Sequence, residues 1–214
     1  MTIALLIKTA YFVAAILFIL GLKGMSSPRT ARQGVMWAGA GMVLATLVTF
    51  LHEGLHNYAL MVIAMASGGA IAYVGAKRVA MTDMPQMVAL YNGMGGGAAA
   101  AIAADELLGG AALAPAVIAL AVAGALIGTV AFTGSLVAFA KLQGLVKKTP
   151  RSRALQLFNL ALGVVTVVLA LWLGAGYGGA GVLALFFIAA ALFGVLITLP
   201  IGGADMPVVI SLLN

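Results

Sequence analysis

The stretch ALAPAVIALAVAGALIGTVAFTGSLVAFA, residues 112–140, decides the class of fold because it contains no charged side chain. A helix needs about 20 apolar residues to cross the hydrocarbon core of a bilayer, and this run is longer. Its glycines, threonines and serine are small residues of the kind that let membrane helices approach one another closely. The stretch therefore predicts a transmembrane helix.

Similar apolar runs fill most of the remaining chain. The sequence is 64% hydrophobic and 7% charged, and its mean hydropathy of +1.20 lies outside the range of soluble domains. We expect an all-α, polytopic transmembrane helix bundle that forms one membrane domain over residues 1–214. Seven complete helices are predicted near 2–22, 34–51, 57–75, 84–104, 112–140, 154–173 and 179–199, and an eighth begins at about 206.

The basic residues indicate how the bundle is oriented. If the loops alternate between the two faces, ten of the eleven lysines and arginines fall on the face opposite the N-terminus: Lys23, Arg29, Arg32, Lys77, Arg78, Lys141, Lys147, Lys148, Arg151 and Arg153. Basic loops are usually cytoplasmic, so we expect the N-terminus outside. The loops on the outer face then contain His52, Glu53, His56, Asp105 and Glu106. The first run carries no basic residue before it, which favours a retained helix over a signal peptide.

Several classes of function are disfavoured by composition. The chain has no cysteine, which excludes disulfides and thiolate metal sites. His52 and His56 are four residues apart but lack a third ligand, so no metal site is expected. The net charge of +6 does not indicate nucleic-acid binding, because the basic residues gather in loops on one face.

A repeat is visible in two short strings. DMPQMVALYN, residues 83–92, returns as DMPVVISLLN, residues 205–214, with five identities in ten positions and an offset of 122 residues (205 minus 83). The same offset places Ser27-Pro28-Arg29 on Thr149-Pro150-Arg151. Four helices separate the copies, so both run in the same direction across the membrane. We expect a parallel internal repeat with halves at roughly 1–104 and 112–214.

The repeated strings place equivalent polar residues at two depths. Asp83 and Asp205 precede prolines at helix starts, where a carboxylate either caps free amides or gates the cytoplasmic end of a pathway. Asn92 and Asn214 lie nine residues further on, which is roughly 13 Å into the bilayer. An amide at that depth needs a polar partner, either a neighbouring helix or water in a wetted path. The residues alone leave both alternatives open for each pair.

Other polar side chains have the same two interpretations. Thr133 and Ser135 in the long apolar run, and Asn159 in the next one, either support helix packing or hold water in a pore.

Three strings together resemble the beta subunit of the proton-pumping transhydrogenase: MTDMP at 81–85, FTGSLVAF at 132–139 and GGADMPVVIS at 202–211. The resemblance runs from Thr9 to the last residue. It implies a membrane domain that conducts protons while soluble domains transfer hydride between NAD(H) and NADP(H). No cofactor is expected on these residues, because they contain no glycine-rich dinucleotide turn between a strand and a helix. Members of the family continue into a cytoplasmic NADP-binding domain, so we expect this sequence to be part of a longer chain.

The resemblance also implies roles for individual residues. Asn214 matches an asparagine linked to proton conduction, Ser135 a serine of the channel-lining helix, and Asp205 an acid at the cytoplasmic boundary. At Asn92 some members have a histidine thought to relay protons, and an amide does not titrate in that range. The relay then uses waters, Tyr91 or a histidine from a partner subunit, and we favour the partner.

The resemblance further implies partners and a location. We expect alpha-type subunits that supply other membrane helices and the soluble NAD-binding domain, in a homodimeric complex in the cell inner membrane. The alternative from another class is a proton- or cation-coupled secondary transporter of a small solute. The scarcity of charges inside the membrane disfavours it. A scaffold subunit whose asparagines only hold helices together is a third possibility.

Overall fold

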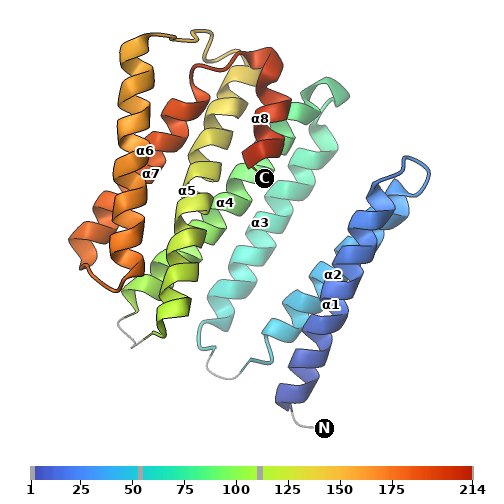
Figure 1. Cartoon of the computed structure of the whole chain (residues 1–214). Coiled ribbons are helices and arrows are strands. Elements are labelled where there is room, and N and C mark those ends of the chain that lie inside the picture. Colours follow the sequence, from blue (N-terminus) through green and yellow to red (C-terminus); the bar gives the residue numbers. More distant parts are fainter. Residues whose placement is uncertain (1–2, 53–54, 110–112, 214) are drawn as a thin grey trace. The chain divides into compact units, whose positions relative to one another are not determined.

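A computed structural model describes residues 3–52, 55–109 and 113–213, and the regular secondary structure of these residues is helical, without a strand. Figure 1 shows the α-helices, joined by short loops and by two short 3₁₀ turns. The predicted all-α fold class is confirmed. The elements are α1 (Ile3–Met25), α2 (Ala31–Thr49), α3 (Tyr58–Arg78), η1 (Met81–Asp83), α4 (Met84–Leu108), α5 (Pro115–Leu142), α6 (Arg153–Gly174), α7 (Ala180–Thr198), η2 (Gly203–Asp205) and α8 (Met206–Leu213).

Some helices continue past the charged residues at which the predicted runs stopped. Asp105 and Glu106, predicted in a loop, lie in the last turns of α4. Lys141, also predicted in a loop, lies inside α5 and is buried. Both predictions were wrong because charged side chains end an apolar run without ending a helix, whose backbone hydrogen bonds do not depend on side-chain polarity. Glu53 lies outside the described residues.

Six helical segments of the described residues are long and apolar enough to cross a membrane. They are α1, α3, η1 with α4, α5, α6 and α7. The 19-residue α2 is not among them, since Arg32 and Gln33 in its first turn make it less apolar.

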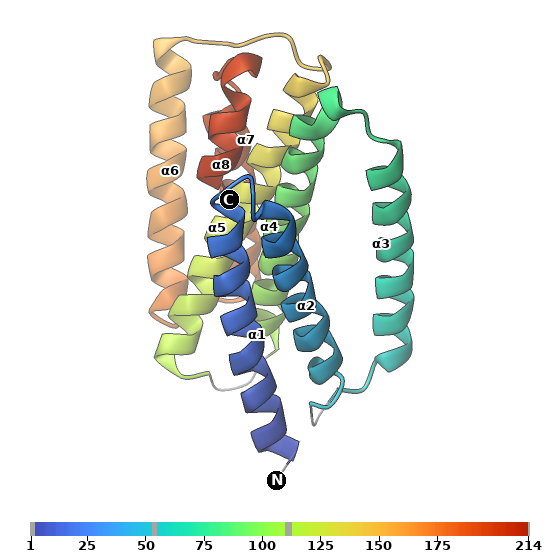
Figure 2. The same ribbon diagram turned by 90° about the vertical axis from the view of Figure 1, so that its right-hand side faces the viewer.

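The chain divides into two compact units, Met1–Lys77 and Arg78–Asn214. In the first unit α1 and α2 run antiparallel and side by side (Figure 2). Small residues allow this contact: a Cβ added to Gly21 would lie 2.9 Å from the Ala38 Cβ and from the Gly34 carbonyl oxygen. None of the residues of α3 is buried.

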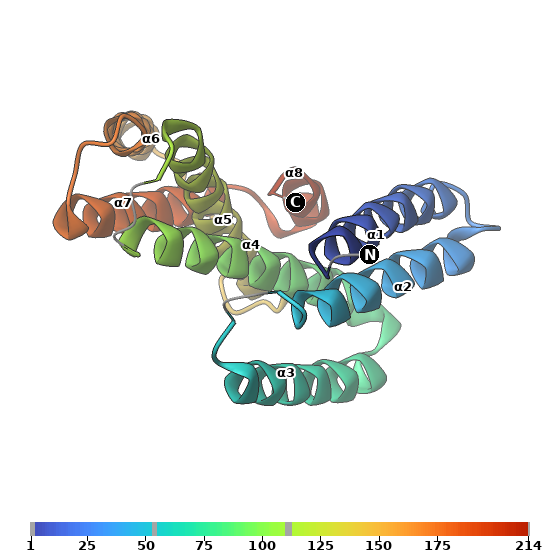
Figure 3. The same ribbon diagram turned by 90° about the horizontal axis from the view of Figure 1, so that it is seen from below.

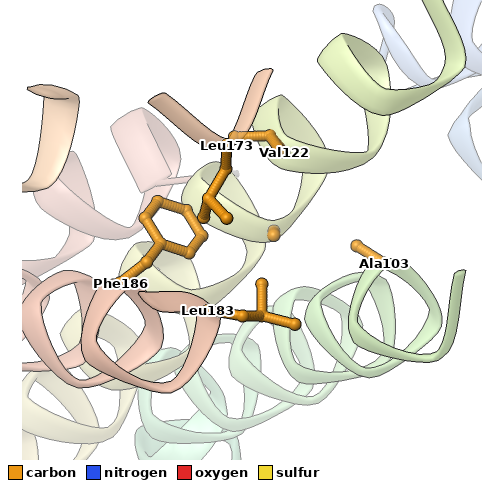
Figure 4. Close-up of a cluster of buried hydrophobic side chains, with 6 residues drawn as sticks. Ala103, Val122, Leu173, Leu183 and Phe186 are labelled. Atoms are coloured by element: carbon orange, nitrogen blue, oxygen red, sulfur yellow. The ribbon is translucent and has the colours of Figure 1, made fainter. Parts of the chain in front are cut away.

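In the second unit α5 is the central helix. It contacts α4, α6, α7 and α8, and Figure 3 shows it between α4 and α6. We call the end of this unit at which η1 and η2 lead into α4 and α8 the junction end, and the opposite end the far end. An apolar cluster at the junction end holds Ala89, Ala138, Met206 and Ile210. Another toward the far end holds Ala103, Val122, Ala125, Leu173, Leu183 and Phe186 (Figure 4).

From the second helix of each copy onward, the element boundaries reproduce the sequence repeat. The starts of α2 and α6 (31 and 153), α3 and α7 (58 and 180), η1 and η2 (81 and 203), and α4 and α8 (84 and 206) are each 122 residues apart. The repeat therefore extends well beyond the two strings that reveal it. Its copies pack differently, since α7 is buried at six positions and α3 at none.

Neighbouring glycines of α4 offer a matched test of the packing. A Cβ on Gly96 would lie 2.8 Å from the Gly128 carbonyl oxygen of α5, whereas a Cβ on Gly95 meets nothing within 4 Å. We expect Gly96→Ala to lower the unfolding temperature of the purified protein in detergent, because α4 and α5 must separate. Overpacking of this kind typically costs about 1–3 kcal/mol.

Gly95→Ala is the control. Alanine is the better helix former by about 1 kcal/mol, so this variant should unfold at the same temperature or a higher one. Equal destabilisation by both substitutions would contradict the assigned α4–α5 contact.

Candidate functional site

The site is centred on a hydrogen bond between α4 and α5. The Asn92 amide donates from Nδ2 to the Ser135 Oγ at 2.9 Å, across 43 residues of sequence. Ser135 is completely buried and Asn92 is half-buried. Two residues predicted separately as pathway residues are thus direct partners.

Around this pair, glycines allow the backbones of α4 and α5 to lie close together. A Cβ on Gly93, next to Asn92, would lie 3.2 Å from the Ser135 Cβ, and one turn further along Gly96 meets the backbone of Phe132 and Gly128. Small residues at membrane helix contacts permit such an approach. The glycines therefore bring a short asparagine side chain within reach of a shorter serine.

The pair keeps hydrogen-bonding capacity beyond this one contact. An asparagine amide has two donor hydrogens and two acceptor lone pairs, and a serine hydroxyl both donates and accepts. One hydrogen bond between membrane helices contributes only about 0.6 kcal/mol on average, so this bond by itself adds little to the stability of the α4–α5 contact. The remaining donors and acceptors of the pair suit water molecules or a polar group of a partner.

Thr133 and Tyr91 take no part in the Asn92–Ser135 hydrogen bond. The Thr133 Oγ1 donates to the Thr129 carbonyl of its own helix at 3.0 Å, and a Cβ on Gly194 of α7 would collide with it. Thr133 therefore lies at the contact of α5 with α7. Tyr91 is 45% exposed on α4.

Asn214 lies outside the described residues, but α8 is placed up to Leu213. Met206 and Ile210 are buried against Ala89 of α4 and Ala138 of α5, each one helical turn from Asn92 and Ser135 respectively. The structure thus brings the second copy of the repeated string against the helices that carry the first copy and Ser135.

The repeated aspartates Asp83 and Asp205 end the 3₁₀ turns and are exposed at the junction end. Asp83 occupies the N-cap position of α4, but its carboxylate caps no backbone amide. It accepts instead from the Gln86 Nε2 at 3.4 Å. For Asp83 the capping interpretation is therefore wrong, and the carboxylate is accessible to water.

The sequence did not predict the hydrogen bonds that Lys141 makes. Its Nζ donates to the Leu199 and Ile201 carbonyl oxygens at 2.5 and 2.6 Å, and the Arg151 Nε donates to the Pro200 carbonyl oxygen at 3.0 Å. The only signal in the sequence was that Lys141 directly follows an uninterrupted apolar run.

Two further polar atoms in the described part of the chain are buried without a hydrogen-bond partner, the Thr129 Oγ1 and the Asn159 Oδ1. Thr129 is 93% buried on α5, one turn before Thr133. Such atoms usually have an ordered water or another partner. The pore and packing interpretations of Asn159 both stay predictions.

A cavity of about 330 Å³ lies at the far end. Glu106, Tyr177 and the glycine-rich segment 176–179 line part of its wall. Leu173 and Leu183 line the cavity as well, and both belong to the apolar cluster toward the far end. The cavity thus combines an exposed carboxylate at its rim with an apolar floor.

Comparison with known proteins decides the family. The sequence model of the NAD(P) transhydrogenase beta subunit matches residues 7–214. The chain belongs to this family. Among its relatives, the NAD(P) transhydrogenase subunit beta of Rhodospirillum rubrum is 42% identical over 219 aligned positions, which cover 98% of this chain and 47% of the relative. The sequence from a named strain of that species gives the same values.

The transhydrogenase resemblance drawn from the three strings is thereby confirmed. The chain spans about half the length of the curated relatives it matches. All three strings, and the Asn92–Ser135 hydrogen bond, lie within the part that the transhydrogenase family model covers.

A double-mutant cycle tests the hydrogen bond itself. We expect Asn92→Ala and Ser135→Ala to be non-additive in unfolding free energy, with a coupling of about 0.6 and at most about 1.7 kcal/mol. The measurement is equilibrium unfolding of both single variants and of the double variant in mixed detergent.

Thr166→Val serves as the remote partner, because the Thr166 hydroxyl donates to Leu162 of its own helix at 2.7 Å. It should combine additively with Asn92→Ala within about 0.5 kcal/mol. Additivity of the Asn92 and Ser135 variants as well would argue against a direct bond.

Proposed function

We propose that this chain conducts protons across the membrane as part of a proton-translocating NAD(P) transhydrogenase. In this proposal soluble domains bind NAD(H) and NADP(H) and transfer the hydride, while the helices described above move the proton. The observation that carries the proposal is the Asn92–Ser135 hydrogen bond, which places two polar side chains together between apolar helices of a transhydrogenase family member.

A proton crosses hydrocarbon only along hydrogen-bonded groups, because an isolated charge is too costly there. Asn92 and Ser135 do not titrate near neutral pH, so their role is to hold and orient water. Tyr91, Thr133 and Asn214 extend this pathway. The hydroxyl of Thr133 already donates to Thr129 and therefore contributes as an acceptor.

The titrating group comes from a partner. Asn92 stands where some family members have a histidine, and a histidine supplied by an alpha-type subunit restores a group that changes charge near neutral pH. The half-buried position of Asn92, against the full burial of Ser135, supports an approach from the α4 side.

Asp83 and Asp205 form the cytoplasmic gate. Both are exposed, both end a 3₁₀ turn, and they are equivalent in the repeat. Contacts with the NADP-binding domain change with nucleotide occupancy and bias these carboxylates, so that the path opens to one face at a time.

The far-end cavity is the outer mouth of the path. Glu106 at its rim collects protons, and the apolar cluster at its floor, drawn in Figure 4, excludes water. This cluster is the outer barrier, because water does not cross a contact of packed leucine and phenylalanine side chains. Opening of the path therefore requires α7 to move relative to α4 and α5.

The complex lies in the cell inner membrane as a homodimer that includes the alpha-type subunits. The N-terminus is outside and the basic loops are cytoplasmic, following the positive-inside bias. The fully unburied α3 supports contact with lipid or with partner helices.

The proton pathway is tested in the complete enzyme reconstituted in vesicles. We expect Asn92→Leu, Ser135→Ala and Asn214→Leu each to lower proton pumping at least about tenfold, since each removes a group that holds water. Hydride exchange between the soluble domains should remain at the wild-type rate. Internal pH dyes and absorbance at a nucleotide band measure the two activities.

Ser211→Ala is the matched control for these variants. The Ser211 Oγ is exposed and donates to the Val208 carbonyl of its own helix at 2.7 Å. It should pump normally, and normal pumping by Asn92→Leu as well would refute the pathway.

Two neighbouring carboxylates test the outer mouth. Glu106 lines the cavity, whereas Asp105 is not among the residues that form its wall. Glu106→Gln should slow pumping several-fold when the outer pH is alkaline and protons are scarce, because a positioned carboxylate raises local proton supply. Pumping rates across a series of outer pH values provide the measurement.

Asp105→Asn removes the same charge one residue away and should leave the pH profile unchanged. Identical profiles for both variants would mean that general surface charge, and not the cavity, supplies the proton.

A further inference from the structure

The turn directly after α7 is held by cations that come from elsewhere in the second unit. The carbonyl oxygens of Leu199, Pro200 and Ile201 each accept a hydrogen bond, from Lys141, Arg151 and Lys141 respectively, at 2.5, 3.0 and 2.6 Å. Lys141 is on α5, and Arg151 is in the loop before α6. Three consecutive carbonyls thus share two positive side chains.

Burial of the Lys141 side chain at this position costs free energy. The side chain is only 6% exposed, and a buried ammonium is destabilising unless its hydrogens are bonded. Leu199 is the C-cap of α7 and Ile201 lies two residues beyond it. Carbonyls at this end of a helix lack partners in the helix and carry partial negative charge. Lys141 therefore compensates the end of α7, and the end of α7 compensates Lys141.

In the first copy of the repeat, the positive charge at the corresponding helix end comes from that helix itself. At the offset of 122, Leu199 and Pro200 correspond to Lys77 and Arg78 at the end of α3, while Lys141 corresponds to Ile19 of α1. The first copy has its cations on the third helix itself. The second copy has apolar residues there and receives the charge from α5, which ties two helices together.

The segment held in this way leads directly to the proposed gate. Ile201 precedes η2, which ends at Asp205, and Met206 at the start of α8 is fully buried. On α5, Lys141 lies six residues after Ser135, less than two helical turns away. One side chain thus connects the helix that carries Ser135 to the junction that carries Asp205.

We propose that Lys141 is a positioning residue for proton coupling, which holds the α7–α8 junction in register with α5 so that Asp205 and Ser135 act on the same pathway. Arg151 reinforces this contact from the exposed side. The inference rests on the proposed proton conduction. Lys141 itself neither binds nor relays the proton.

The test uses the complete enzyme in vesicles and measures proton pumping and hydride exchange separately. Lys141→Met should lower pumping at least about tenfold with hydride exchange retained, because the carbonyls of the half-buried Leu199 and Ile201 lose their donor and the junction moves. Lys148→Met is the matched control, since Lys148 is exposed in the loop that follows α5, and it should pump normally.

A relocated charge distinguishes positioning from simple stability. The double variant Lys141→Leu with Leu199→Lys puts the cation where the first copy has Lys77, so it compensates the end of α7 without a bond from α5. If Lys141 positions the junction, this variant should regain the wild-type unfolding temperature while its pumping stays low. Recovery of both would show that Lys141 only stabilises the helix end, and the proposal would fail.

Lys141→Arg and Arg151→Gln keep the test decisive if Lys141→Met does not fold. Lys141→Arg retains donors to both carbonyls and should pump within about threefold of the wild type. Arg151→Gln removes only the exposed contact and should lower the number of protons moved per hydride. A wild-type ratio in Arg151→Gln together with normal pumping by a folded Lys141 variant that lacks the charge would overturn the inference.

Asn92→Leu in the same vesicles separates this inference from the proposed function. If Asn92→Leu abolishes pumping and Lys141→Met does not, the pathway stands and the positioning role is wrong. If neither variant affects pumping, the proposed function itself fails.

Discussion

The close approach of α4 and α5 is the constraint on which the rest of the second unit depends. Glycines on both helices bring the backbones so near that even a methyl group at Gly96 or Gly128 would overlap the opposite helix. At this separation a short amide reaches a short hydroxyl, and the Asn92–Ser135 hydrogen bond forms. Larger residues would separate the helices and leave both polar groups without this partner in an apolar surrounding.

Three threonines of the second unit satisfy their hydroxyl groups within their own helices. The hydroxyls of Thr133, Thr166 and Thr198 each donate to the carbonyl four residues earlier in their own helix. Asn92 instead donates to another helix, and Lys141 to the turn that follows another helix. A side chain bonded within its helix stabilises only that helix, whereas one bonded across helices fixes their relative register. These two cross-helix contacts lie where the proposed pathway and gate lie.

The two copies of the parallel repeat have helices that start at equivalent positions but pack differently. After the first helix of each copy, the elements of both copies begin 122 residues apart, yet α7 is buried against α5 and α6 while α3 has no buried residue. A duplicated string places an aspartate, a proline and an asparagine at equivalent positions. The neighbours of each copy then decide what the equivalent residues contact, as the different sources of positive charge at the ends of α3 and α7 illustrate.

The sequence by itself determined the helical class, the number and approximate extent of the helices, the repeat and the transhydrogenase family. These follow from the length of apolar runs and from short identical strings, which are local properties of the chain. It also singled out Asn92 and Ser135, because polar residues are rare in such runs. It could not pair them, since the pairing depends on which faces of α4 and α5 meet. Lys141 was misplaced for the same reason: a charge beside an apolar run is normally solvated, and only the folded chain shows that the end of α7 provides its carbonyl partners. The tertiary structure alone decided these contacts, because hydrogen bonds across helices depend on distances between segments far apart in the sequence.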